Sequence, residues 1–200
     1  CLSRGLGDVY KRQDGSVTYM LSGGQWAPTD NYYLRWGNEP VTYSAFYPVT
    51  EGTSVANFSL PINQQSLENL ASADYMTCTV EDAMNEGSGV LHLNMNRRMA
   101  KVIMTLDDID SQSKALGVKI GSYQGYTDGN VSSGTALVSP YVTIPEGGKA
   151  GQSGCKYTAI VAPGAANPNS TFVSLNYKGE DLVLPGIPAT VSYTHLRAHE

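Results

Sequence analysis

Short runs of β-forming residues, each closed by a turn, constrain the fold of this chain more than any other sequence feature. Within most runs apolar side chains alternate with polar ones, which is the period of a strand with one buried face. Glycine, proline and asparagine residues between the runs supply the turn conformations that hairpins need. The runs cover residues 17–21, 32–36, 43–47, 90–95, 102–106, 138–144, 157–162 and 171–177. Many short strands with regular turns predict an all-β chain built from antiparallel β-sandwiches.

A single stretch has helical rather than strand periodicity. In residues 65–76, Leu67, Leu70 and Ala71 share one face at the i, i+3 and i+4 spacing. The sequence therefore predicts one short helix, which we expect to pack on a sheet edge.

The apolar residues change phase between two neighbouring runs. They occupy odd positions in residues 90–95 and even positions in residues 102–106. Because strand side chains have a period of two, we expect a bulge or bend at residues 96–99. The preceding residues 85–89 are polar and glycine-rich, as is typical where few contacts cross between domains. We therefore expect a first sandwich over residues 14–88 and a second over residues 89–190.

Both ends of the chain differ in composition from the residues between them. Residues 1–13 and 191–200 resemble translated sequencing-adapter ends, so we expect both segments to be foreign and exclude them from the fold prediction. This exclusion removes three apparent signals: Cys1 as a lipidated cysteine, Arg12 as a processing site, and His195 with His199 as a metal-binding pair. Any export signal is expected upstream of the sequence.

The charge balance limits the partners of the chain. Without the two end segments, nine basic and 16 acidic residues leave a net charge of −7. An acidic chain without a basic stripe argues against nucleic acid and anionic lipid as partners. No apolar run approaches the roughly 18 residues of a membrane-spanning helix, so no transmembrane segment is predicted.

Two cysteines remain between the end segments, Cys78 and Cys155. Two thiols are too few for a four-cysteine zinc site or a dense disulfide framework. They either pair with each other or lie apart as small buried apolar residues, and we favour the second arrangement.

Residues that could carry catalysis are scarce. The one histidine between the end segments, His92, is out of phase with its apolar neighbours and is expected to face solvent. No nucleophile elbow or phosphate-binding glycine loop is present. Residues 107–110 hold three aspartates but no glycine of a Ca²⁺ loop, which indicates a solvated turn. We therefore predict that the chain is not an enzyme and needs no cofactor or metal.

Aromatic residues are concentrated in residues 26–47. Such a cluster could stack on sugars, with Trp26, Trp36 and Tyr47 as the candidate glycan contacts. Alternatively, these rings pair across neighbouring strands and fill the core of the first sandwich. We favour the second interpretation, because the strand alternation already explains half of these rings.

Several short motifs follow one another along the chain, at residues 33–36, 45–48, 62–66, 73–78, 91–102, 160–163 and 172–175. Taken in order, they resemble the fimbrillin-like family of type V pilus subunits and related adhesins. In that family a tryptophan strand precedes an Ala-Tyr-Tyr-Pro-like strand, an Asp-Gln-Ser-like turn precedes Ser-Asp-Leu-Met, and a His-x-x-Ala-Lys strand opens the later sandwich. Asn63 and the pair Asn96 and Arg97 depart from the family pattern.

This resemblance implies a specific architecture and function. It implies two transthyretin-like β-sandwiches, both incomplete in this sequence, in a structural subunit or adhesin of a cell-surface fimbria. It further implies export through the outer membrane as a lipoprotein precursor and assembly with other pilin subunits by β-strand exchange. Glycans or proteins of host or bacterial surfaces are the expected adhesion partners. An extracellular carbohydrate-binding module is the alternative.

Overall fold

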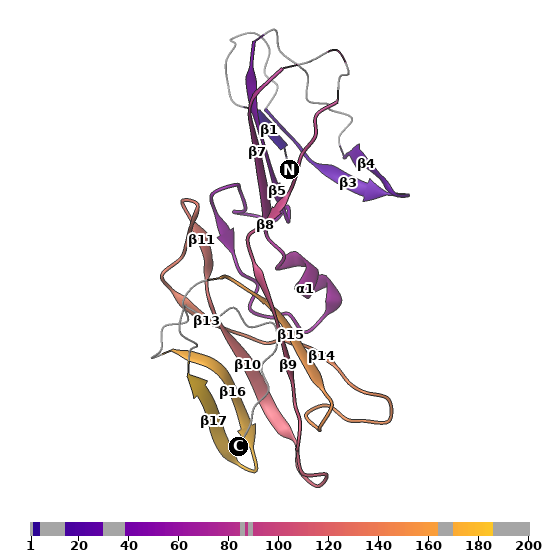
Figure 1. Cartoon of the computed structure of the whole chain (residues 1–200), viewed down its shortest axis with the longest axis vertical. Helices are drawn as coiled ribbons and strands as arrows, with labels where there is room; N and C mark the ends of the chain where they lie inside the picture. The colour runs from indigo at the N-terminus through magenta and orange to yellow at the C-terminus, as the bar shows by residue number, and fades with distance from the viewer. Residues whose placement is uncertain are drawn as a thin grey trace.

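The computed structural model is an elongated, nearly all-β molecule with several antiparallel sheets and one short helix (Figure 1). It describes residues 2–4, 15–29, 39–84, 87, 90–163 and 170–185. The all-β fold class is therefore confirmed. The predicted strand at residues 32–36 lies outside the described residues, as do most residues of the expected linker at 85–89.

A five-stranded antiparallel sheet, here called the first sheet, occupies the upper part of the view in Figure 1. Its longest strand pair, β5 with β7, buries Tyr43, Ala45 and Cys78 on one face. A separate hairpin of β3 (Tyr19–Ser22) and β4 (Gln25–Pro28) turns at Gly23 and Gly24, both at positive φ. In spatial order the strands of the first sheet are β2 (Ser16–Val17), β1 (Leu2–Arg4), β5 (Val41–Tyr47), β7 (Met76–Ala83) and β8 (Asn96–Arg97).

The lower part is a sandwich of two antiparallel sheets around a shared core. Met104 and Tyr157 of one sheet pack with Val118 and Val173 of the other. One sheet has the order β13 (Thr135–Val138), β10 (Ala115–Tyr123), β16 (Thr171–Tyr177) and β17 (Glu180–Pro185). The facing sheet has the order β14 (Tyr141–Thr143), β15 (Lys156–Val161) and β9 (Ala100–Thr105).

A small third sheet joins the two parts of the molecule. Its strands are β12 (Asn130–Val131), β11 (Gly125–Thr127) and β6 (Phe58–Ser59), in that order. The paired strands β6 and β11 approach so closely at Gly125 that a Cβ on this residue would lie 1.9 Å from the Phe58 carbonyl oxygen. Gly125 also has a φ of +135°, so both its space and its backbone require glycine. Phe58 and Leu60 thereby enter a core cluster with Ile120 and Val138 of the sandwich.

The helix is shorter than predicted. Helix α1 spans Leu67–Ser72, and the Ser66 side chain caps it by accepting a hydrogen bond from the Asn69 N–H. Leu70 packs against the sandwich core, whereas Leu67 is 66% exposed and Ala71 is also exposed. The expected apolar face is therefore wrong for two of its three residues.

The predicted strand at residues 90–95 is wrong, although its alternation is real. Leu91, Leu93 and Met95 are half-buried and His92 and Asn94 are exposed, but no strand ladder includes them. The bend expected at residues 96–99 is confirmed at Met99, where the chain leaves the first sheet and enters the sandwich through β9. The domain boundary near residue 88 stays a prediction.

Candidate functional site

Two of the three candidate glycan contacts, Trp26 and Tyr47, lie among the described residues, on different strands. Trp26 lies on β4 opposite Leu21 and is 64% exposed, so it is not a core residue. Tyr47 is half-buried at the end of β5, in the first sheet rather than in the β3–β4 hairpin. Trp36 lies outside the described residues. A shared glycan site stays a prediction.

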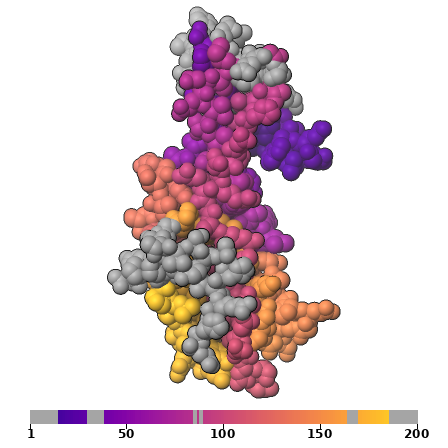
Figure 2. All heavy atoms as spheres, in the orientation of Figure 1, coloured from indigo at the N-terminus to yellow at the C-terminus, as the bar shows by residue number. Residues whose placement is uncertain are grey.

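The β3–β4 hairpin is the most exposed apolar element of the described chain. Met20 and Leu21 of β3 are 61% and 55% exposed, and their partners across the hairpin are Ala27 and Trp26. Figure 2 shows this hairpin, in indigo, standing out from the body of the molecule. Exposed apolar side chains of this kind mark recognition surfaces.

The other candidate surface is β17, the last strand of its sheet among the described residues. Leu182, Val183 and Leu184 are each about half exposed, and in the part of the chain that the structure describes β17 pairs only with β16. Leu184 is opposite Val173 and therefore faces the core side of its sheet, yet it is 46% exposed. An edge strand presents unpaired backbone N–H and C=O groups that another strand can pair with. Sequence reasoning missed β17, although Lys178 and Gly179 supply a hairpin turn before it.

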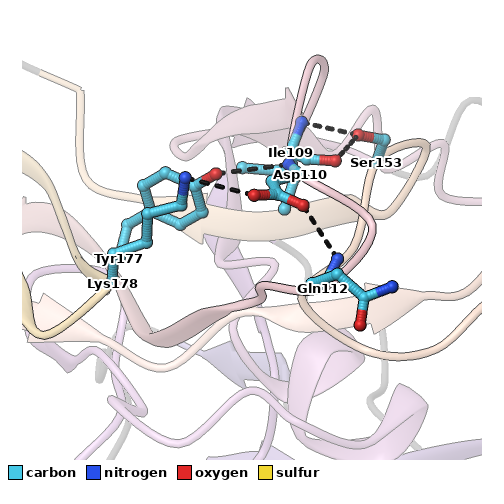
Figure 3. A network of polar contacts seen from close by, with 6 residues as sticks. All are labelled: Ile109, Asp110, Gln112, Ser153, Tyr177 and Lys178. Atoms are coloured by element: carbon cyan, nitrogen blue, oxygen red, sulfur yellow. Dashed lines mark hydrogen bonds and ion pairs between the residues drawn. The ribbon is translucent and has the colours of Figure 1, made fainter.

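A network of polar contacts ties the turn between β16 and β17 to the acidic turn at residues 107–112 (Figure 3). The Asp110 carboxylate accepts a hydrogen bond from the Gln112 N–H and lies 3.2 Å from Lys178 Nζ. Both contacts lower the pKa of Asp110, the backbone hydrogen bond most, while the same carboxylate raises the pKa of Lys178. The Asp110 N–H donates to the Tyr177 hydroxyl.

A second part of the same network holds the acidic turn from the opposite side. The Ser153 hydroxyl donates to the Ile109 carbonyl oxygen and accepts from the Ile109 N–H (Figure 3). The predicted turn at residues 107–110 is thus a solvated turn held by a lysine, a tyrosine and a serine.

Nothing in the described residues points to catalysis. His92 is exposed, as predicted, and the described part of the chain holds no group of three or more His, Cys, Asp or Glu residues that could bind a metal ion. Cys78 and Cys155 are both buried and free, which confirms the unpaired arrangement. No helix in the described ranges has the length and apolar character needed to cross a membrane.

The sequence matches the fimbrillin-like family over residues 8–196. The chain belongs to the fimbrillin-like family. The match includes residues 8–13 and 191–196, which lie in the two end segments expected to be foreign. Their exclusion stays a prediction.

A solved structure shares the fold of this fimbrillin-like chain. It is a protein from Bacteroides uniformis to which a provisional role in cell adhesion is assigned. The TM-score is 0.60 at 14% identity, and the match covers 92% of this chain and 76% of the other. No curated protein sequence matches the fimbrillin-like chain.

Proposed function

We propose that this fimbrillin-like chain is a structural subunit or adhesin of a cell-surface fimbria and that it joins its neighbours by β-strand exchange. The observation that carries the proposal is the pairing of a short strand, β1, with the β5 edge of the first sheet. Among the described residues, β1 (Leu2–Arg4) pairs with Tyr43, Ser44 and Ala45 of β5. A strand from another subunit would pair with this edge in place of β1, because the pairing uses backbone hydrogen bonds.

Strand β1 itself lies in the segment expected to be foreign. Since a strand pairs through its backbone, an unrelated sequence can occupy a vacant strand position. The pairing of Leu2–Arg4 between β5 and β2 therefore supports a β5 edge that accepts strands of varied sequence. The exposed edge of β17 is a second place where subunits would meet.

The family and the cell-adhesion relative support a location at the cell surface. We extend the proposal to export through the outer membrane as a lipoprotein precursor and to two transthyretin-like sandwiches in the complete subunit. Other pilin subunits are the proposed partners, together with surface glycans or proteins for an adhesin.

The test of strand exchange uses a chain that lacks residues 1–13 and therefore lacks β1. We expect this chain to dimerise or aggregate through its open edge, and a peptide of residues 1–6 to raise its melting temperature with increasing peptide concentration. A peptide of the same composition in scrambled order measures how much of the effect is independent of side chains. A monomeric shortened chain with a cooperative transition that neither peptide shifts would contradict strand exchange.

The exposure of Trp26 favours one alternative, an extracellular carbohydrate-binding module. An exposed indole can stack on a sugar ring. Glycan-array binding that Trp26→Ala or Trp36→Ala abolishes would support this alternative, and Tyr47→Ala tests whether the third ring contributes. Binding unaffected by all three substitutions would reject it.

A further inference from the structure

The described chain passes between the first sheet and the sandwich three times. The first crossing follows β5 and leads through residues 48–57 to β6. The second leads from α1 through residues 73–75 to β7, and the third leads from β8 through residues 98–99 to β9. Any bending between the two parts of the molecule must therefore deform these three crossings (Figure 1).

Tyr75, on the second crossing, contacts the other two crossings directly. Its hydroxyl donates a hydrogen bond of 2.8 Å to the Ser54 carbonyl oxygen on the first crossing. Its own carbonyl oxygen accepts a bond of 2.9 Å from the Arg98 N–H on the third. The Tyr75 ring is 1% exposed and stacks on Phe58, the first residue of β6, with ring centroids 4.7 Å apart.

Tyr126 of β11 attaches the third crossing to the sandwich. Its hydroxyl donates to the Arg98 carbonyl oxygen at 2.6 Å, and its ring lies 5.4 Å from that of Tyr75. The Arg98 guanidinium lies over the Tyr126 ring, 5.3 Å from its centroid, and donates to the Gly129 carbonyl oxygen. Burial raises the pKa of both tyrosines, so each keeps its hydroxyl proton for donation.

We propose that five residues form a clasp that makes the three crossings unfold and refold locally as one unit. They are Tyr75, Ser54, Phe58, Arg98 and Tyr126. While these contacts are intact, the first sheet and the sandwich move together as one rigid body. Tyr75 bonds to the first crossing through its side chain and to the third through its backbone carbonyl oxygen, so in a coupled clasp the loss of the side-chain bond also loosens the third crossing. The inference concerns the subunit alone and holds whether or not strand exchange occurs.

Amide hydrogen exchange of the full 200-residue chain tests this coupling. Tyr75→Phe keeps the ring but removes the bond to Ser54, so local loss alone would speed exchange only in residues 50–57. The clasp predicts that exchange also speeds up at residues 73–76 and 97–100, by about threefold to tenfold, which is the factor expected for one lost hydrogen bond. Exchange in β10 and β16 should stay unchanged.

The matched control is Tyr157→Phe, which removes a hydroxyl from another tyrosine of the sandwich core, 7% exposed. It should speed exchange around β15 and leave all three crossings unchanged. Tyr126→Phe removes the bond to Arg98 on the third crossing. It should speed exchange in the same three crossings as Tyr75→Phe. An effect of Tyr75→Phe confined to residues 50–57, or an equal acceleration in every strand including β10, would overturn the proposal.

Discussion

The first sheet and the sandwich are built from similar strands but bury them to different degrees. In the sandwich, Ile120 and Val138 are completely buried between two sheets that share a core. In the first sheet, Tyr43 is buried to that degree, while the neighbouring Val80 is only half-buried and Thr79 is exposed. A sheet with one buried face depends on its edges and partners, whereas the sandwich carries its own core. This difference favours the first sheet as the part that accepts a strand from another subunit.

The largest expected effect is a direct measurement of this difference. Ile120→Ala should lower the free energy of unfolding by about 3 kcal/mol, because it leaves a cavity in a closed core. Val80→Ala in the first sheet should cost only about 1 kcal/mol, because part of that side chain already contacts water. Chemical denaturation of both variants provides the two values, with Ile103→Ala, on an exposed part of β9, as the control.

Equal losses for Ile120→Ala and Val80→Ala would mean that the first sheet has a core as closed as that of the sandwich. The inference that the first sheet accepts a strand from another subunit would then fail. A larger loss for Val80→Ala would reverse the comparison.

The sequence predicted most of the sandwich strands because their alternation matches their burial. In β9, Met104 is buried and Ile103 is exposed, as the even phase of residues 102–106 predicts. The same rule failed at residues 90–95, because alternation reports which side chains face water and not whether a neighbouring strand pairs with the backbone. At residues 90–95, the sequence predicted which side chains are buried but not whether the backbone pairs with a strand.

The longest strand of the molecule escaped prediction for a related reason. Strand β10 buries Ala115, Val118 and Ile120, but its phase shifts at the irregularity between Leu116 and Lys119, where Gly117 has a φ of +60°. A bulge of this kind breaks the period-two signal within one strand.

The candidate site was predictable only in part, since the exposure of Trp26 depends on a hairpin that projects from the first sheet.

A smaller effect is expected where residues early in the chain reach into the sandwich. Gln64 is completely buried, and its side-chain amide accepts from the Ile160 N–H and donates to the Ile160 carbonyl oxygen, both at 2.8 Å. The amide thus pairs with β15 as a neighbouring strand would. Gln64→Leu should cost about 2 kcal/mol, because it leaves both buried backbone groups of Ile160 without their partner.

Denaturant unfolding measures the Gln64→Leu loss, and hydrogen exchange at the Ile160 amide shows whether it is local. The neighbouring Gln65 is exposed, so Gln65→Leu should change stability by less than about 0.5 kcal/mol. If Gln64→Leu were as mild as Gln65→Leu, this segment would not be a structural part of the sandwich, and the two regions would be more independent than we infer.

The smallest effect is expected at the solvent-exposed contact between Asp110 and Lys178, beside the β17 edge. The contacts of Asp110 lower its pKa, so their contribution to stability is present above the ordinary carboxyl pKa of about 4 and is lost as the pH falls through the folded-state value. The pKa of Lys178 is raised, so its contribution to stability is lost only when the pH rises through its folded-state pKa.

Asp110→Asn keeps an oxygen for the Gln112 N–H and removes the charge. It should lower the melting temperature at pH 7 by less than about 2 °C, and the difference from the unsubstituted chain should shrink further below pH 3. A difference that persists unchanged in acid would assign the effect to the geometry of the turn rather than to the ion pair.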